Sequence, residues 1–178
     1  NVSASWRPAA PCPAPTGCRS GKAAGAYLAW WMAAAREAAF ATRNRRIGVI
    51  GTAATIRSRS YEKLLRQLVP GVEITAQACP LFVPLVEAGY VDHSEESRQQ
   101  VTKLVIAQYL TEVREAGVDT LILGCTHYPL LKTMIGEFMG QSVTLVDPAK
   151  TAATIWNRCS PSAACALHRS TRVRRTST

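Results

Sequence analysis

Four short apolar runs recur between residues 46 and 147, and segments with helical patterns separate them. Each run carries β-branched residues and ends at a glycine, a cysteine or an acidic residue, as buried strands do. One of them, DTLILG, holds an unbroken apolar stretch, which is typical of a parallel strand covered on both faces. The sequence therefore predicts strands over 46–52, 72–79, 119–124 and 142–147.

The segments between these runs show the spacing of apolar residues that is typical of helices. A helix is expected over 58–69, and a shorter one over 81–88. Ser94 is placed to cap a longer helix, which Gly117 closes. The buried face of this longer helix is expected to include Val101, Leu104, Val105, Tyr109 and Val113.

Strands that alternate with helices at this spacing predict an α/β fold. The strands form a parallel sheet with helices on both faces, and the connections are right-handed. In such sheets a ligand binds beyond the carboxyl ends of the strands. The residues just past those ends are expected to form the rim of a small-ligand site, and they are Thr52, Thr55, Cys79, Cys125, Thr126, His127 and Asp147.

The two ends of the chain lack this periodicity. Residues 1–34 and 151–178 mix proline, alanine, serine, arginine and cysteine, so we predict irregular extensions, the second of them basic, around one α/β domain at 35–150. The positive net charge of +9 lies in residues 1–46 and 151–178, and residues 47–150 carry slightly more acidic than basic side chains. We therefore expect no specific binding of nucleic acid.

The six cysteines give no sign of a metal site. None of them forms a C-x2-C pair, and Cys159, Cys165 and His168 do not have a usual zinc spacing. The longest uncharged apolar run, 23–35, is shorter than the roughly 20 residues that a transmembrane helix needs. We expect no bound metal, no membrane span and a cytoplasmic location.

The segment LILGCTHYPLL, residues 121–131, places a thiol, a hydroxyl and an imidazole in three consecutive positions where a strand gives way to a helix. A helix N-terminus favours the thiolate form of a cysteine, and His127 is close enough in sequence to assist Cys125. Such a thiol serves either as a nucleophile or as a base that removes a proton. The alternative is a small buried residue that packs the end of the strand.

Three segments closely resemble glutamate racemases of the aspartate/glutamate racemase superfamily: RIGVIGTAATIRSRSYEKLL, ITAQACPLFVPLVEAGY and GCTHYPLL. The resemblance extends from about residue 35 to residue 150 and is to the second of the family's two domains. It implies a flavodoxin-like α/β domain and a cofactor-independent bacterial enzyme that interconverts L- and D-glutamate and supplies the D form for peptidoglycan. In this family two cysteines, one from each domain, exchange protons on opposite faces of the substrate.

The resemblance also implies roles for individual residues. Cys125 matches the second catalytic cysteine. Thr126 and His127 match residues that contact the substrate, and His127 assists the thiol. No cofactor is implied, and the five lysines lie in no recognisable Schiff-base context.

Three further residues match site positions of the family. Glu87 matches a carboxylate near the histidine, and Thr52 and Thr55 match positions close to the substrate carboxylate. The alternative for the two threonines is helix capping, and the alternative for Glu87 is a solvated helix face. Cys79 is expected to be structural.

The sequence departs from the family outside this middle region. The family's Asp-Ser-Gly motif and its Ala-Cys-Asn-Thr stretch have no counterpart, and Cys12 and Cys18 lie in proline-rich sequence. We therefore expect an incomplete chain that is weakly active or inactive. A disturbed reading frame or a truncated coding sequence around a racemase domain is our hypothesis for the character of the ends. Two alternatives stay open, a one-cysteine decarboxylase of the same superfamily and a non-catalytic ligand-binding remnant. A homodimer is a further open option.

Overall fold

The sheet has four strands, β1 (Arg46–Gly51), β2 (Glu73–Ala78), β3 (Thr120–Leu123) and β4 (Thr144–Val146). The computed structural model describes residues 22–151 of the chain. All pairs are parallel, and the order across the sheet is β2-β1-β3-β4. Val49 of β1 is opposite Ala76 of β2 and Ile122 of β3, so β1 is paired along both edges. The predicted parallel α/β fold is confirmed.

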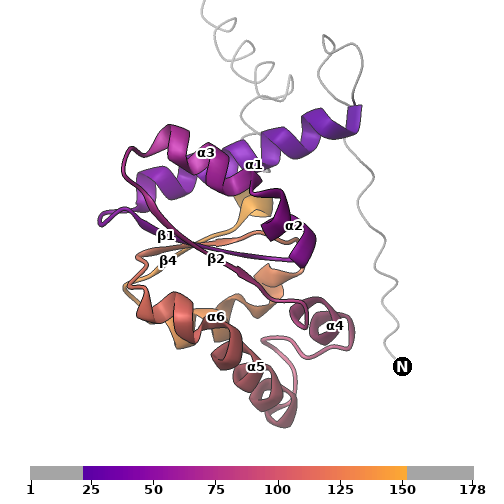
Figure 1. The fold of residues 1–178 in the computed structure, drawn as a ribbon. Helices are drawn as coiled ribbons and strands as arrows, with labels where there is room; N and C mark the ends of the chain where they lie inside the picture. Colours follow the sequence, from indigo (N-terminus) through magenta and orange to yellow (C-terminus); the bar gives the residue numbers. More distant parts are fainter. Residues whose placement is uncertain (1–21, 152–178) are drawn as a thin grey trace, which may run out of the picture.

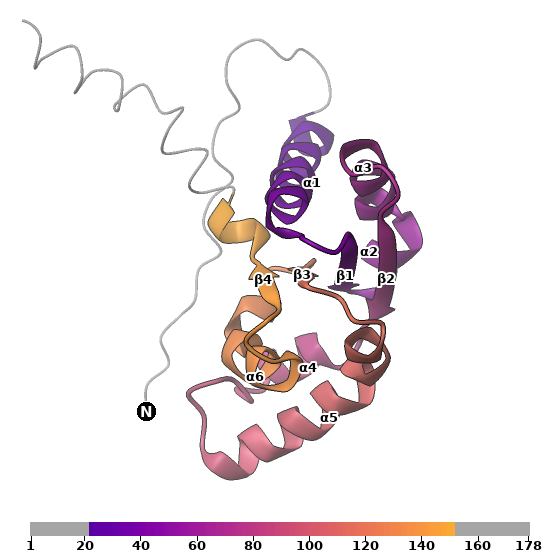
Figure 2. The same ribbon diagram turned by 90° about the vertical axis from the view of Figure 1, so that its left-hand side faces the viewer.

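Helices cover both faces of the sheet (Figure 1, Figure 2). Their bounds are α1 (Lys22–Ala41), α2 (Ala53–Ser58), α3 (Ser60–Leu68), α4 (Phe82–Glu87), α5 (Glu96–Glu115) and α6 (Lys132–Met139), and the 3₁₀ turn η1 (Tyr128–Leu131) leads into α6. Helices α1 and α3 pack on one face, and α4, α5 and α6 pack on the other. Each face therefore has its own apolar core.

Helix α1 begins at Lys22, inside the segment that the sequence predicts to be irregular. That prediction is wrong for residues 22–34, because alanine has the highest helix propensity and α1 is rich in it. Ala34, Ala35 and Ala38 are fully buried, so their small side chains let α1 lie close to the sheet. None of the helices between residues 22 and 151 combines the length and the apolar character that crossing a bilayer requires.

The buried face of α5 differs from the predicted one. Val101 and Leu104 are 44% and 73% exposed, whereas Thr102 and Ile106 are fully buried. The hydroxyl of Thr102 donates to the carbonyl oxygens of Tyr90 and Arg98, and these bonds offset the cost of burying it. The prediction assumed that the packed face of α5 carries only apolar residues. In the structure this face includes Thr102, whose hydroxyl is hydrogen-bonded.

The starts of two helices also differ from the prediction. Ser94 does not cap α5, because its hydroxyl donates to the carbonyl oxygen of Val91 and Glu95 occupies the N-cap position. The helix predicted over 58–69 is α3, and α2 precedes it as a separate short helix. Arg59 separates the two because its φ of 51° is left-handed and interrupts the helical path.

Asp92, in the loop that precedes α5, forms hydrogen bonds to the turn before α6 and to the start of that helix. Its carboxylate accepts hydrogen bonds from the backbone N–H groups of Thr133 and Met134, at 2.8 and 3.1 Å. Its own N–H donates to the carbonyl oxygen of Leu130. These bonds satisfy the first N–H groups of α6, which have no partner inside the helix. They also fix η1, the element that follows the cysteine segment.

Candidate functional site

The candidate site lies where the strand order reverses, between the carboxyl ends of β1 and β3. The N–H of Gly124 donates to the carbonyl oxygen of Ile50 at 2.7 Å, so the chain leaving β3 passes directly over the end of β1. A Cβ on Gly124 would lie 2.7 Å from that oxygen, which leaves no room for a side chain. Glycine therefore brings Cys125 to the point where parallel sheets of this type bind their ligands.

Cys125, His127 and Glu87 form a line of three side chains. Sγ of Cys125 lies 3.8 Å from Nδ1 of His127, and Nε2 of His127 lies 3.7 Å from Oε1 of Glu87. The thiol is half-buried, the imidazole is 31% exposed and the carboxylate is 66% exposed. Because the two ring nitrogens face different partners, the imidazole can accept a proton on the thiol side while the carboxylate stabilises its charged form.

The backbone around the thiol offers hydrogen-bond donors. Among residues 22–151, the N–H groups of Thr126 and His127 have no hydrogen-bond acceptor. The side chain of Thr126 is exposed. Successive unpaired N–H groups in a turn form a concavity that suits an anion. The segment after β3 therefore combines a thiol with donors for negative charge.

Thr52 and Thr55 lie on the β1 side of this site. The hydroxyl of Thr52 accepts a hydrogen bond from the backbone N–H of Thr55, so Thr52 is the N-cap of α2, as the capping alternative predicts. The two hydroxyls are 3.1 Å apart. Cγ2 of Thr55 lies 3.6 Å from the position that a Cβ on Gly124 would occupy. Thr55 is therefore next to the cysteine segment while Thr52 holds the start of α2.

The other predicted rim residues do not join this group. Cys79 is fully buried, and burial raises the pKa of its thiol to about 12, so it behaves as a structural residue. Oδ1 of Asp147 accepts the N–H groups of Ala149 and Lys150 and caps the segment after β4. The order of the strands explains this difference, because only β1 and β3 end at the reversal.

Two tyrosines next to the site were not predicted as part of it. Tyr128 is fully buried, and its hydroxyl donates to the carbonyl oxygen of Cys79 at 2.9 Å. Burial, followed by the nearby thiols of Cys79 and Cys125, raises the pKa of Tyr128. For Tyr61, burial and then the charge of Cys125 raise the pKa. Tyr128 could have been found from its place in the cysteine segment, whereas Tyr61 lies far from it in sequence.

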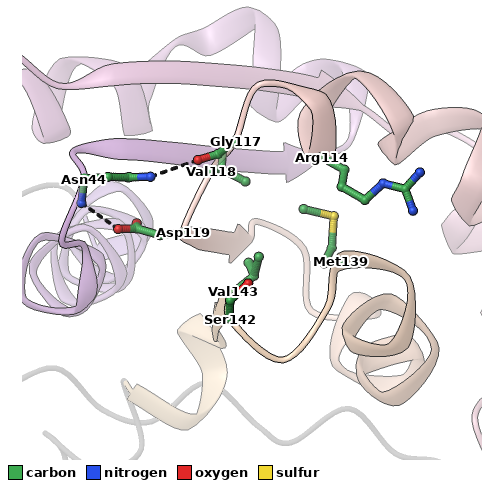
Figure 3. A pocket seen from close by; sticks show the side chains of 8 residues that line it. All are labelled: Asn44, Arg114, Gly117, Val118, Asp119, Met139, Ser142 and Val143. Atoms are coloured by element: carbon green, nitrogen blue, oxygen red, sulfur yellow. Dashed lines mark hydrogen bonds between the residues drawn. The ribbon is translucent and has the colours of Figure 1, made fainter.

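A separate cavity of about 380 Å³ lies at the opposite end of the strands. Figure 3 shows the side chains that line it, which are Asn44, Arg114, Val118, Asp119, Met139, Ser142 and Val143, together with Gly117. None of these residues is a cysteine or a histidine, and they precede β3 and β4 rather than follow them. Among residues 22–151, no three histidine, cysteine or acidic side chains are grouped so that they could hold a metal ion.

Comparison with known proteins gives one consistent result. Residues 30–155 match the family model described as Asp/Glu/Hydantoin racemase. The chain is 54% identical over 121 residues to a glutamate racemase of Geobacter metallireducens, and the matched region covers 68% of this chain and 43% of that protein. It is 48% identical over 113 residues to a glutamate racemase of Enterococcus faecalis, and this match covers 64% of this chain and 39% of that protein. The chain thus spans less than half the length of these relatives.

Solved structures give the same result. The crystal structure of a glutamate racemase isoform from Bacillus anthracis matches with a TM-score of 0.63 and 35% identity, over 72% of this chain and 48% of that one. A glutamate racemase from Francisella tularensis, solved in complex with D-glutamate, matches with a TM-score of 0.61 and 28% identity, over 84% and 49%. Sequence motif, fold and relatives agree, and the chain belongs to the Asp/Glu/hydantoin racemase family of isomerases.

Proposed function

We propose that this chain carries one half of a glutamate racemase site and that Cys125 exchanges the proton on one face of the substrate Cα. The observation that carries this proposal is the line of Cys125, His127 and Glu87 at the reversal of the strand order. The proposed substrate follows from the relatives, which are named as glutamate racemases, one of them bound to D-glutamate.

The proposed reaction uses only groups of the protein. The thiolate of Cys125 takes the proton from Cα, so the Cα–H bond breaks and an S–H bond forms. The electron pair left on the carbon spreads into the substrate carboxylate, whose negative charge increases. The N–H groups of Thr126 and His127 and the hydroxyls of Thr52 and Thr55 are the proposed donors to that carboxylate. His127, supported by Glu87, stabilises the thiolate before the transfer.

Inversion requires a proton donor on the opposite face of Cα. A single thiol returns its proton to the face from which it took it, so on its own it exchanges the proton and keeps the configuration. In the proposal, a second cysteine comes from the portion of the relatives that this chain does not match. D-glutamate made by the complete site is proposed to serve peptidoglycan synthesis in the cytoplasm.

The proposal is tested by incubating the purified chain with L-glutamate in D₂O. Proton NMR follows loss of the Cα–H signal, and circular dichroism follows the optical signal of glutamate. We expect slow loss of the Cα–H signal without loss of optical activity, and no exchange by the Cys125→Ser variant. A folded wild-type chain that neither exchanges nor inverts glutamate would contradict the proposal. Inversion that depends on Cys125 would contradict the half-site part of it.

A further inference from the structure

Tyr61 packs directly beneath the segment that carries the reactive thiol. It belongs to α3, its side chain is only 4% exposed, and the ring of Trp31 lies behind it with centroids 6.4 Å apart. Cε2 of its ring lies 3.2 Å from the position that a Cβ on Gly124 would occupy. Cε2 is bonded to the carbon that bears the hydroxyl, so the hydroxyl end of the ring lies at the cysteine segment.

The hydroxyl of Tyr61 has no hydrogen-bond partner among residues 22–151. By contrast, the hydroxyl of Tyr128, the buried tyrosine on the other face of the sheet, donates a hydrogen bond to the carbonyl oxygen of Cys79. No fully buried side-chain oxygen or nitrogen in the described part lacks a partner, so the hydroxyl of Tyr61 still touches solvent. A tyrosine that is otherwise buried thus presents a free donor at the edge of the site.

We propose that Tyr61 is a positioning residue whose hydroxyl stabilises the thiolate of Cys125 through one bridging water. The thiol is half-buried and the hydroxyl touches solvent, so a water has access to both groups. No direct hydrogen bond joins the two groups, which is why a water is required. The inference rests on the proposed function, in which the thiolate is the reacting form.

Electrostatics agrees with this role. Burial, followed by the charge of Cys125, raises the pKa of Tyr61, so the phenol keeps its proton in the pH range in which a cysteine ionises. A protonated phenol next to a thiolate can only donate. The titratable groups near the thiol are the imidazole of His127, with the carboxylate of Glu87 behind it, and the phenol of Tyr128. The hydroxyl of Tyr128 already donates to the carbonyl oxygen of Cys79. Tyr61 would add a neutral donor from the opposite face of the sheet.

The test compares the rate of Cys125 alkylation by iodoacetamide in the full chain, the Tyr61→Phe variant and a Tyr109→Phe control. Trypsin places Cys125 in the peptide 115–132, which contains no other cysteine, so mass spectrometry reads this thiol alone. The rate is followed from about pH 6 to about pH 10, which brackets the titration of ordinary thiols. Tyr109 is a suitable control because its ring packs on Phe82 within the core of the other face.

We expect Tyr61→Phe to move the midpoint of the alkylation profile upward by about one pH unit, which makes alkylation about tenfold slower near neutral pH. Tyr109→Phe should leave the midpoint unchanged. An identical midpoint in the wild type and Tyr61→Phe would overturn the inference. So would a Tyr61→Phe variant that no longer melts cooperatively, because the hydroxyl would then have a structural partner. The readout needs no glutamate, so it can succeed where racemisation fails.

Discussion

Oε1 of Glu87 lies 3.7 Å from Nε2 of His127, so a carboxylate from α4 faces the imidazole that stands beside the thiol of Cys125. Both partners are solvent-accessible, and exposed ion pairs contribute only about 0–1 kcal/mol to stability. The pair is therefore better suited to orienting the imidazole than to holding the fold. In this orientation Nδ1 points to the thiol.

The first prediction follows from this pair. Glu87→Gln should leave the free energy of unfolding within about 0.5 kcal/mol of the wild type, but it should slow alkylation of Cys125 by roughly two- to fivefold, the factor that such a pair is worth. Glu137→Gln is a matched control, because Glu137 pairs with Lys103 at 3.0 Å with similar exposure and lies on α6. Equal alkylation rates in the two variants would show that Glu87 does not act on the thiol.

The second prediction concerns the two cysteines between residues 22 and 151. Burial raises the pKa of Cys79 from 9.0 to about 12, so its thiolate fraction near neutral pH is about a thousandfold below that of an ordinary thiol. Iodoacetamide should therefore modify Cys125 in the native chain and leave Cys79 unmodified. Mass spectrometry of the peptides 115–132 and 67–98 separates the two sites.

The denatured chain supplies the control for this experiment. In urea both thiols should react at similar rates, because burial no longer protects Cys79. Native rates that are already similar would mean that the segment after β2 opens readily.

Much of the fold could be predicted because each strand can be recognised from its own short stretch of sequence. Apolar runs that end at Gly51 and Gly124 mark β1 and β3, and the spacing between runs requires helical crossovers. The buried face of α5 could not be predicted in the same way. Leu104 is apolar and exposed, and Thr102 is polar and buried, because a distant carbonyl oxygen at Tyr90 satisfies its hydroxyl. Contacts of this kind depend on the assembled fold.

The same distinction between local sequence and contacts of the assembled fold applies to the residues of the candidate site. Cys125 and His127 lie two residues apart in sequence, and their position after a strand already suggests chemistry. Glu87 entered only through the resemblance to a family, since nothing in its local sequence brings it to His127. Tyr61 and Asp92 were not predicted, because their roles arise from packing against Gly124 and from long-range capping of α6.

The third prediction concerns acid stability. The carboxylate of Asp119 accepts the backbone N–H groups of Arg43 and Asn44, at 2.6 and 2.7 Å, and the hydroxyls of Thr42 and Thr120. Partial burial alone would raise the pKa of Asp119, but these donors outweigh it and lower the pKa. The stabilisation is therefore present above the ordinary range of aspartate, about pH 4, and is lost as the pH falls through the lowered value.

Urea denaturation of the wild type and Asp119→Asn at pH 7 and pH 3 tests this dependence. We expect the variant to be less stable by about 2 kcal/mol at pH 7, since hydrogen bonds to a charged group are lost, and the difference should shrink at pH 3. Glu115→Gln, which changes an exposed acidic side chain at the end of α5, should show no such pH dependence. A difference that stays constant between the two pH values would assign the effect to shape rather than to charge.

The last prediction concerns two glycines whose surroundings differ. A Cβ on Gly124 would lie 2.7 Å from the carbonyl oxygen of Ile50 and 3.2 Å from the ring of Tyr61, and neither the backbone nor a packed ring can move aside easily. A Cβ on Gly136, inside α6, would meet only Cδ1 of Leu145 at 3.5 Å, an ordinary contact. The same substitution by alanine should therefore have opposite effects at the two positions.

We expect Gly124→Ala to lower the free energy of unfolding by about 2–3 kcal/mol, the cost of forcing an extra methyl group into a packed site. Gly136→Ala should raise it by about 0.5–1 kcal/mol, because alanine loses less backbone entropy than glycine in a helix. Urea denaturation measures both changes, and alkylation of Cys125 should change only in Gly124→Ala. If both variants were equally stable, the close approach of Gly124 to Ile50 would not be what places the thiol at the end of β1.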